Sequence, residues 1–529
     1  MVACLVNGLV NPLSAHLSFS ASVQPVFCFT SLGTRIYRAT LMFLLAAASH
    51  TLFPSRRLIV SHSVGEALYY YYHEDSEISS NDIDLLNERV TSLVLNDFPI
   101  VQETLSFIKA VDLFTSMKRD QTVALLNHLN DPLIKINRMV NVGSQSVIDG
   151  DYIDLVYFET VLASSTGVCQ SFLIEKYRGG LLLRFPTSGT FSLAPFFDNL
   201  HLYNVYEEYN FWGRVLGVDS VASLNSKAMA NDIKHFILVC EALHDQKIGK
   251  IAENITERFE NGGGLVLISG PSSSGKTTCS FRLEIALRAR GRQVVTFNLD
   301  SFYLPRAETP LDEEGNYDYE SVYALDLPLL RDTVKSMISG AETAIPDFDF
   351  KTGLRVERKS VVVLPKNGVL LMEGLHALNP ILFEGLEFEL LTYKIFISPL
   401  SQLNVDDNNR ISTSDTRLCR RLVRDFKFRG NDAETTFKLW PRVVAGEHQW
   451  IYAFQDQADI FFNSALDYEF CVMKTFALPL LHSIKPTSLW YSEARRMISF
   501  LSVFHSISME YIPFTSLLRE FLGSSWFDY

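Results

Sequence analysis

The chain has 529 residues, of which 47% are hydrophobic and 20% are charged, and this length and composition predict two to four globular units with sizeable cores. The net charge of −13 disfavours a general nucleic-acid or membrane-surface binder, so neither nucleic acid nor membrane is expected as a partner. The seven cysteines are scattered and none forms a C-x-x-C pair, which is typical of reduced thiols in a cytoplasmic protein; the serine-rich first residues leave an organelle address open.

Apolar periodicity and turn residues in the first 260 residues predict a mixture of helices and strands. Residues 1–30 alternate apolar and small polar residues, which favours short strands or a poorly ordered lead. Helices are expected at 37–53, 81–96 and 105–129, strands at 58–65, 69–72 and within 149–185, and a helical connector at 222–260. Three glycines after Asn261 mark the clearest boundary. We therefore divide the chain into a lead (1–30), an α+β domain (31–225), a helical connector (226–260), an α/β domain (261–478) and a helical tail (479–529), with a helix at 495–518.

Within the α+β domain, His62 is followed four residues later by Glu66. Residues from about 30 to 220 resemble the second additional domain of threonyl- and alanyl-tRNA synthetases, in which an H-x-x-x-H pair and a later Cys/His pair surround an editing pocket. The matching places here are Glu66, Phe158 and Leu162, so a four-ligand metal site is not expected. A domain kept for structure, regulation or dimerisation is favoured over one that hydrolyses a substrate or binds RNA. The sequence leaves open whether the chain forms a homo-oligomer.

Residues 265–278 have the pattern of a strand, a phosphate loop and a helix. An apolar run ends in a glycine, and the spacing that follows is that of a Walker A loop. The residues that would hold the nucleotide are Gly270, Ser272, Ser273, Ser274, Gly275, Lys276, Thr277 and Thr278. Glycines allow backbone N–H groups to surround phosphate oxygens, and the following helix presents its positive end to them. Lys276 adds a cation for the outer phosphates, and Thr277 adds a hydroxyl for a phosphate-bound Mg²⁺.

Two carboxylates follow apolar strands beyond the loop. Asp300 comes after the run 294–299, and Glu373 ends the run 368–372. Ligands of open α/β sheets lie outside the carboxyl ends of the strands. Asp300 is therefore expected to accept a proton from an attacking hydroxyl or to hold metal-bound water, and Glu373 to lie beside Mg²⁺ as in a Walker B arrangement.

Further strands are expected at 393–397 and 468–473. Alternation of strands with helices predicts an α/β fold with a doubly wound parallel sheet, preceded by the α+β domain.

An arginine stripe lies between these last two strands. Spacings of three, four and seven place its members on one helical face: Arg417, Arg420, Arg421 and Arg424, with Asp425 and Arg429 after them. Arginines without interleaved acids repel one another unless an anion is present. We interpret the stripe as a lid that clamps phosphates, in preference to a solvated basic face.

Together these motifs resemble the uridine kinase/phosphoribulokinase family in its long two-domain form. The resemblance rests on residues 270–278, 300–303, 346–350, 372–374 and 417–430, and it implies a P-loop kinase that phosphorylates a sugar hydroxyl with ATP and Mg²⁺. It implies that Lys276 holds the outer phosphates, that Thr277, Glu373 and Asp300 surround Mg²⁺, and that Asp300 is the general base. Arg421 and Arg424 would belong to the lid. The implied substrate-side residues are Asp318, for ribose hydroxyls, with Phe348, Arg417 and Arg429.

The chain departs from uridine-cytidine kinases where those enzymes read the pyrimidine. The matching places are Phe348, Gly353, Asn431 and Leu439, which leaves few side chains to hydrogen-bond uracil. Three hypotheses follow: a nucleoside kinase, a kinase for a non-nucleoside sugar or sugar phosphate, and a nucleotide-binding regulatory or RNA-associated factor. The first is favoured.

Overall fold

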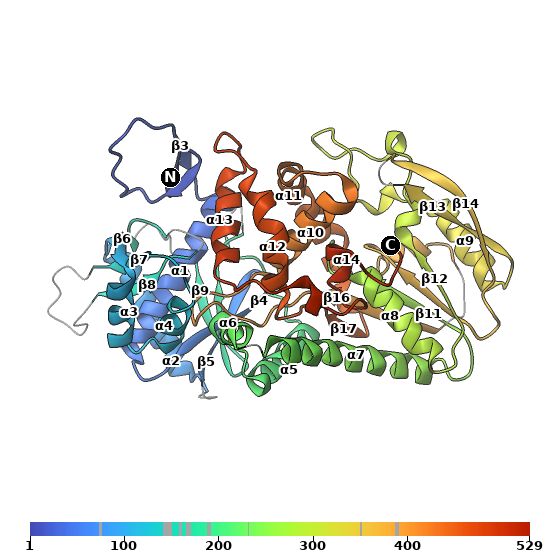
Figure 1. The fold of residues 1–529 in the computed structure, drawn as a ribbon, viewed down its shortest axis with the longest axis horizontal. Coiled ribbons are helices and arrows are strands. Elements are labelled where there is room, and N and C mark those ends of the chain that lie inside the picture. The colour runs from blue at the N-terminus through green and yellow to red at the C-terminus, as the bar shows by residue number, and fades with distance from the viewer. Residues whose placement is uncertain are drawn as a thin grey trace.

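The computed structural model describes residues 1–73, 77–140, 151–157, 161–165, 171–187, 192–230, 232–349, 352–386 and 391–529. The sequence predictions for Phe158, for part of the strand region 149–185 and for residue 350 fall outside these ranges. The molecule is elongated, with the first helices at one end of its long axis and the hairpin β13–β14 at the other (Figure 1).

The first 30 residues form a small antiparallel sheet in the order β2-β1-β3. Its strands are β1 (Ala3–Val6), β2 (Leu9–Asn11) and β3 (Val23–Val26). Thr30 then caps the next helix, because its side chain accepts a hydrogen bond from the backbone N–H of Gly33 at 3.1 Å.

Residues 31–187 combine helices with two antiparallel sheets, in the orders β4-β5-β10-β9 and β6-β7-β8. The helices are α1 (Ser31–Leu52), α2 (Ser80–Leu95), α3 (Phe107–Ser116) and α4 (Asp120–Leu126). The strands are β4 (Leu58–Val64), β5 (Ala67–Tyr72), β6 (Ile100–Ser106), β7 (Leu133–Met139), β8 (Tyr152–Leu155), β9 (Leu173–Tyr177) and β10 (Gly180–Arg184). The buried face of α1 lies in one core cluster with β4, β5 and β10, so this region is an α+β unit.

Three helices lead into the second half: α5 (Leu200–Leu216), α6 (Val221–Met229) and α7 (Ile233–Arg258). No helix is predicted from the sequence at the position of α5. The long helix α7 packs along α8 (Figure 1). The two halves of the chain are also hydrogen-bonded to each other. The backbone N–H of Val60 on β4 donates to the carbonyl of Asp407 in the second half at 2.9 Å.

A five-stranded parallel sheet in the order β12-β15-β11-β16-β17 forms the centre of the second half. Its strands are β11 (Gly264–Ser269), β12 (Val294–Asn298), β15 (Val369–Glu373), β16 (Leu391–Ser398) and β17 (Ile460–Asn463). Val266 and Ile268 pack with α8 (Lys276–Arg288) in one cluster, whereas Leu265 and Leu267 pack with α9 (Leu327–Ile338) in another. Helices therefore cover both faces, which confirms the predicted α/β fold preceded by an α+β unit.

The expected fifth strand at 468–473 is wrong. These residues begin the helix α12 (Glu469–His482), and the fifth strand is the four-residue β17 before it. A short buried apolar run fits a strand and a buried helix equally well. The predicted boundary at 478 also falls inside α12.

The remaining elements lie around the sheet. They are the hairpin of β13 (Thr343–Asp349) and β14 (Leu354–Val362), the helices α10 (Thr413–Arg424) and α11 (Ala433–Trp450), and the terminal helices α13 (Tyr491–Ser502) and α14 (Arg519–Leu522). The helix expected at 495–518 ends at Ser502, and a 3₁₀ turn at Met509–Tyr511 and the short α14 follow it. In the parts of the chain that the model describes, no helix has the length and apolar character needed to cross a bilayer.

Candidate active site

The loop between β11 and α8 has the backbone conformation that an anion cradle requires. Gly275 has φ of 89° and Ser273 has φ of 61°. Both values lie in the left-handed region, where residues other than glycine are uncommon. The hydroxyls of Ser273 and Ser274 are buried and have no hydrogen-bond partner among the described residues. Donors that remain unpaired beside a helix N-terminus suit a phosphate group.

Lys276 folds back on this loop. Its Nζ donates to the carbonyls of Gly270 at 2.9 Å and Pro271 at 3.2 Å. Burial lowers the pKa of Lys276, while the nearby carboxylates of Glu373 and Asp300 act to raise it. The ammonium is thus placed between the loop and two acids.

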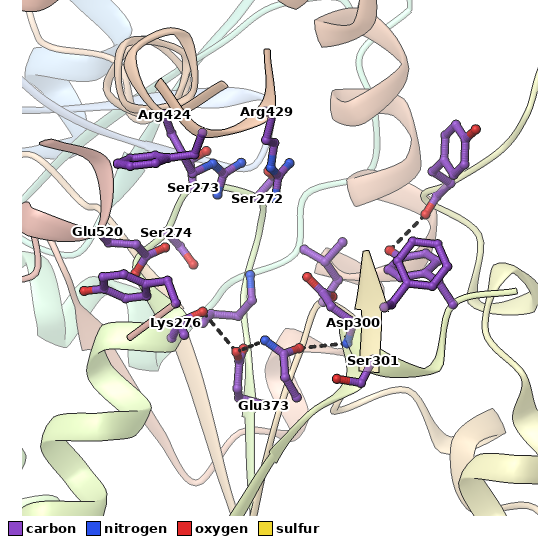
Figure 2. A pocket seen from close by; sticks show the side chains of 18 of the residues that line it. Ser272, Ser273, Ser274, Lys276, Asp300, Ser301, Glu373, Arg424, Arg429 and Glu520 are labelled. Atoms are coloured by element: carbon purple, nitrogen blue, oxygen red, sulfur yellow. Dashed lines mark hydrogen bonds between the residues drawn. The ribbon is translucent and has the colours of Figure 1, made fainter. Parts of the chain in front are cut away.

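Strand register brings the two predicted acids together. Asn298 on β12 and Ile268 on β11 both stand opposite Glu373 on β15. The Thr277 hydroxyl donates to Glu373 Oε1 at 3.0 Å, and the Asn298 side-chain amide donates to the same oxygen. The backbone N–H of Asp300 donates to Asn298 Oδ1 at 2.7 Å, so one chain of hydrogen bonds links Thr277, Glu373, Asn298 and Asp300 (Figure 2).

These oxygen donors fit a hard divalent cation. Burial, and then the charge of Asp300, raise the pKa of Glu373 to about 8, so a cation between the two carboxylates would relieve their repulsion. Across the described ranges, no cluster of three or more His, Cys, Asp or Glu side chains could hold a metal ion. A cation at this edge would need further ligands from phosphate oxygens and water, which is how Mg²⁺ is commonly bound.

Two arginines of the predicted stripe are paired with buried acids from other helices. Arg420 contacts Glu469 of α12 at 2.5 Å, and Arg417 pairs with Glu447 of α11. Arg417 also donates to the carbonyl of Ser272 at 2.8 Å, and it is not among the residues that line the large cavity beside the loop. Acids from other helices therefore neutralise these two arginines, although no acid is interleaved with them in sequence. Arg417 contacts the loop backbone and does not line the cavity.

The other arginines share one acid. Asp425 is fully buried and lies 3.2 Å from Arg421, 3.5 Å from Arg424 and 3.7 Å from Arg429. Three guanidinium groups around one carboxylate leave excess positive charge, and burial followed by the charge of Arg429 lowers the pKa of Arg424 to about 10. Arg421 also donates to the Ser272 hydroxyl at 2.9 Å. All three arginines line the cavity, and Figure 2 shows Arg424 and Arg429 beside Ser272 and Ser273. This placement suits them to an anion.

The cavity has a volume of about 2640 Å³ and extends from the phosphate loop to the hairpin β13–β14. Asp318 and Phe348, both predicted for the substrate side, line it. The Phe348 ring lies beside that of Tyr303, with 5.9 Å between the ring centroids. The positions where the chain departs from uridine-cytidine kinases, at 348, 353, 431 and 439, all lie on this wall.

Thr278, the last predicted residue of the loop, contacts the C-terminal segment. Its hydroxyl donates to Glu520 at 2.9 Å and lies 2.8 Å from the hydroxyl of Tyr529. Four residues beside the loop are not predicted from the sequence: Glu520, Tyr529, Asn298 and Glu447. Asn298 could have been noticed as a polar residue at a strand end, whereas nothing in the local sequence marks the other three.

His62 in the first half is buried and its ring stacks on Tyr206, with 3.8 Å between centroids. Burial lowers the pKa of His62 to about 3. Glu66 forms an ion pair with Arg38 at 2.5 Å, and Leu162 is buried.

Comparison with known proteins gives one family match and several relatives for the second half. Residues 265–469 match the family described as "Phosphoribulokinase / Uridine kinase family". A uridine kinase from Deinococcus deserti is 30% identical over 181 residues, which are 34% of this chain and 77% of the relative. Uridine-cytidine kinase B from Dictyostelium discoideum is 28% identical over 188 residues, 34% of this chain and 65% of the relative. A solved structure, titled a possible uridine kinase from Bacillus stearothermophilus, covers 40% of this chain and 100% of its own, with 18% identity and a TM-score of 0.27.

Proposed function

The chain belongs to the phosphoribulokinase/uridine kinase family through its second half, and from this membership we propose that it transfers the γ-phosphoryl group of ATP to a hydroxyl of a small acceptor, with a nucleoside 5′-hydroxyl as the first candidate. The observation that carries the proposal is the hydrogen-bonded chain from Thr277 through Glu373 and Asn298 to Asp300 at the end of the phosphate loop. It joins a donor-side hydroxyl to the backbone N–H of Asp300, whose carboxylate can serve the acceptor.

On the donor side, the backbone of Ser272–Thr278 and the N-terminus of α8 would hold the phosphates. Lys276 is close enough to exchange its bonds to the Gly270 and Pro271 carbonyls for the outer phosphates. Thr277 and Glu373, with Asp300 nearby, would hold Mg²⁺. Bound Mg²⁺ supplies positive charge for the phosphate oxygens during transfer.

On the acceptor side, Asp300 would accept the proton of the attacking hydroxyl as that hydroxyl forms its bond to the γ-phosphorus, the bond from phosphorus to the bridging oxygen breaks and ADP leaves. Arg421, Arg424 and Arg429 exceed the charge of Asp425 and would stabilise negative charge on the transferred group. Arg417 would position the loop through the Ser272 carbonyl, a role that replaces the substrate contact expected from the sequence.

The acceptor side of the cavity suits a polyhydroxyl compound. Asp318 and Glu320 line the cavity, as do Phe348 and Tyr303. Carboxylates are suitable acceptors for vicinal hydroxyls, and Phe348 with Tyr303 offers an aromatic surface for a base.

A free sugar is the second candidate. It is motivated by Phe348, Gly353, Asn431 and Leu439, which line the cavity in place of the residues that hydrogen-bond uracil. Without those partners the wall distinguishes poorly between bases. A sugar without a base would therefore lose little binding free energy at this wall.

The test is ATP consumption by the full chain with Mg²⁺ and a panel of nucleosides, free pentoses and pentose phosphates. We expect product with at least one nucleoside, and Lys276→Ala should abolish it. Product with a free pentose alone would favour the second candidate. Nucleotide binding without any product would contradict both and favour a regulatory factor.

For the first half we propose a degenerate relative of the synthetase domain that serves structure or regulation. The buried, ring-stacked state of His62 and the ion pair of Glu66 with Arg38 leave these residues unsuited to a metal site. Metal analysis of the purified full chain should find no stoichiometric zinc; a bound zinc would contradict the proposal.

A further inference from the structure

A segment beyond the family match reaches the phosphate loop. The match ends at residue 469, and residues 516–529, which we term the C-terminal strap, cross the start of α8 (Figure 1). Leu517, Leu518 and Phe521 are buried in the main core. A Cβ at Gly275 would collide with the Leu517 side chain, so the base of the strap is packed directly on the loop.

Within the strap, Glu520 binds the start of α8. Its Oε2 accepts from the Thr278 hydroxyl at 2.9 Å and from the Thr278 backbone N–H at 3.3 Å. Thr278 is the third residue of α8, and the N–H groups of the first turn have no partner within the helix. They are the groups that bind phosphate oxygens in a loop of this kind. A carboxylate oxygen therefore occupies a place that the proposed function assigns to the nucleotide.

The end of the strap reinforces this contact and lies at the surface. The Tyr529 hydroxyl lies 2.8 Å from that of Thr278, and the Phe527 ring stacks on Phe281 with 5.3 Å between centroids. Beyond Gly523, which has φ of 83°, the Trp526 side chain is 75% exposed, and it contacts only the exposed Phe514 among the rings of the described residues, at 5.9 Å between centroids. An anchored base and an exposed end allow the end to lift without unfolding the core.

We infer that the Glu520 carboxylate competes with the phosphates of the nucleotide for α8, so that nucleotide binding swings the Glu520 side chain away from Thr278 and displaces residues 523–529. This inference rests on the proposed function, because it takes a nucleotide as the ligand of the loop. Glu520 and a phosphate oxygen cannot accept the same N–H group, and two anions at one helix end repel each other. The population with Glu520 in place does not bind, which lowers the apparent affinity. Figure 2 shows Glu520 on the same side of the cavity as Ser274 and Lys276.

The test is calorimetric titration of the full chain with Mg-ADP and with inorganic tripolyphosphate. Glu520→Gln keeps the shape of the half-buried side chain and removes its charge, and we expect about tenfold tighter binding of both probes. The matched control is Glu510→Gln, an exposed residue near the strap, which should leave both affinities unchanged. Thermal melts of each variant establish that the fold is retained. Hydrogen exchange of residues 523–529 should rise when Mg-ADP is saturating.

Three outcomes would overturn the inference. If the wild type binds and Glu520→Gln binds equally well or more weakly, Glu520 is not a competitor, while the proposed function stands. If the strap keeps its protection with Mg-ADP bound, nothing is displaced. If none of the variants binds either probe, the proposed function fails, and the inference fails with it.

Discussion

Glu447 on α11 accepts a hydrogen bond from the backbone N–H of Ser272 at 2.7 Å, and the same carboxylate oxygen pairs with Arg417. A fully buried acid from a helix 175 residues further along the chain therefore holds the phosphate loop.

We expect Glu447→Gln to lower the free energy of unfolding by about 3 kcal/mol, because it leaves the buried Arg417 without a counter-charge. Mg-ADP affinity should fall as well, since the loop loses an anchor. Denaturant unfolding and calorimetry measure both effects. Glu434→Gln, exposed on the same helix, is the control. Unchanged stability in Glu447→Gln would show that the ion pair contributes little.

Replacement of the proposed base should separate chemistry from binding. We expect Asp300→Asn to reduce turnover by about two to four orders of magnitude, because the amide cannot take the proton of the acceptor, while Mg-ADP still binds. Steady-state kinetics with the true acceptor measure the loss, and Asp332→Asn on the exposed side of α9 should be normal. Near-normal turnover in Asp300→Asn would show that another group is the base.

Two arginines four residues apart on α10 should behave oppositely. Arg424→Gln is expected to lower turnover by about 10²–10³-fold without loss of stability, because it removes one of three cations that share Asp425. Arg420→Gln should destabilise the fold by about 3–5 kcal/mol, since Glu469 becomes an unpaired buried charge. Melting curves and kinetics of both variants test this prediction. Equal melting temperatures for the two variants would contradict the separate roles of Arg420 in stability and Arg424 in turnover.

The buried His244 predicts a loss of stability in acid. Its Nε2 donates to the carbonyl of Ala465 at 3.1 Å, and burial, aided by Arg282 and Arg420, lowers its pKa to about 3. In the unfolded chain a histidine binds a proton near pH 6.5. Between these values the unfolded state binds more protons, so the free energy of unfolding falls by about 1.4 kcal/mol per pH unit as the pH drops below 6.5.

His244→Gln retains an amide donor and cannot titrate, so its stability should fall less steeply between pH 6.5 and pH 5 than that of the wild type. The exposed His482 provides the control, because His482→Gln should follow the wild-type curve. Parallel curves for His244→Gln and the wild type would contradict the prediction.

The donor side of the site was predictable because its information is local. A strand, a glycine-rich loop and a helix follow one another in sequence. Glu373 ends β15, Asp300 lies two residues beyond the end of β12, and the parallel register of these neighbouring strands brings both to the same edge. The sheet and its two covered faces follow from the same alternation.

The remaining features depend on partners far apart in the chain. The spacing in sequence places the arginines of the stripe on one face of α10. It does not reveal that Glu447 and Glu469, on two other helices, neutralise two of them. Glu520 meets Thr278 across 242 positions. The run at 468–473 was assigned to a strand because its apolar residues carry no period that separates a strand from a buried helix.

The hairpin β13–β14 carries Phe348 and, among the described strands, pairs with no strand of the parallel sheet. Asn298 and Glu373 lie opposite each other in the parallel sheet, and the hydrogen bonds among Thr277, Glu373, Asn298 and the backbone of Asp300 tie this edge to the phosphate loop. The hairpin lies outside that register, although Arg355 of β14 pairs with Asp326 at 2.9 Å. Substitutions on the hairpin can therefore alter the cavity wall around Phe348 while the strand register at the edge of the sheet stays the same.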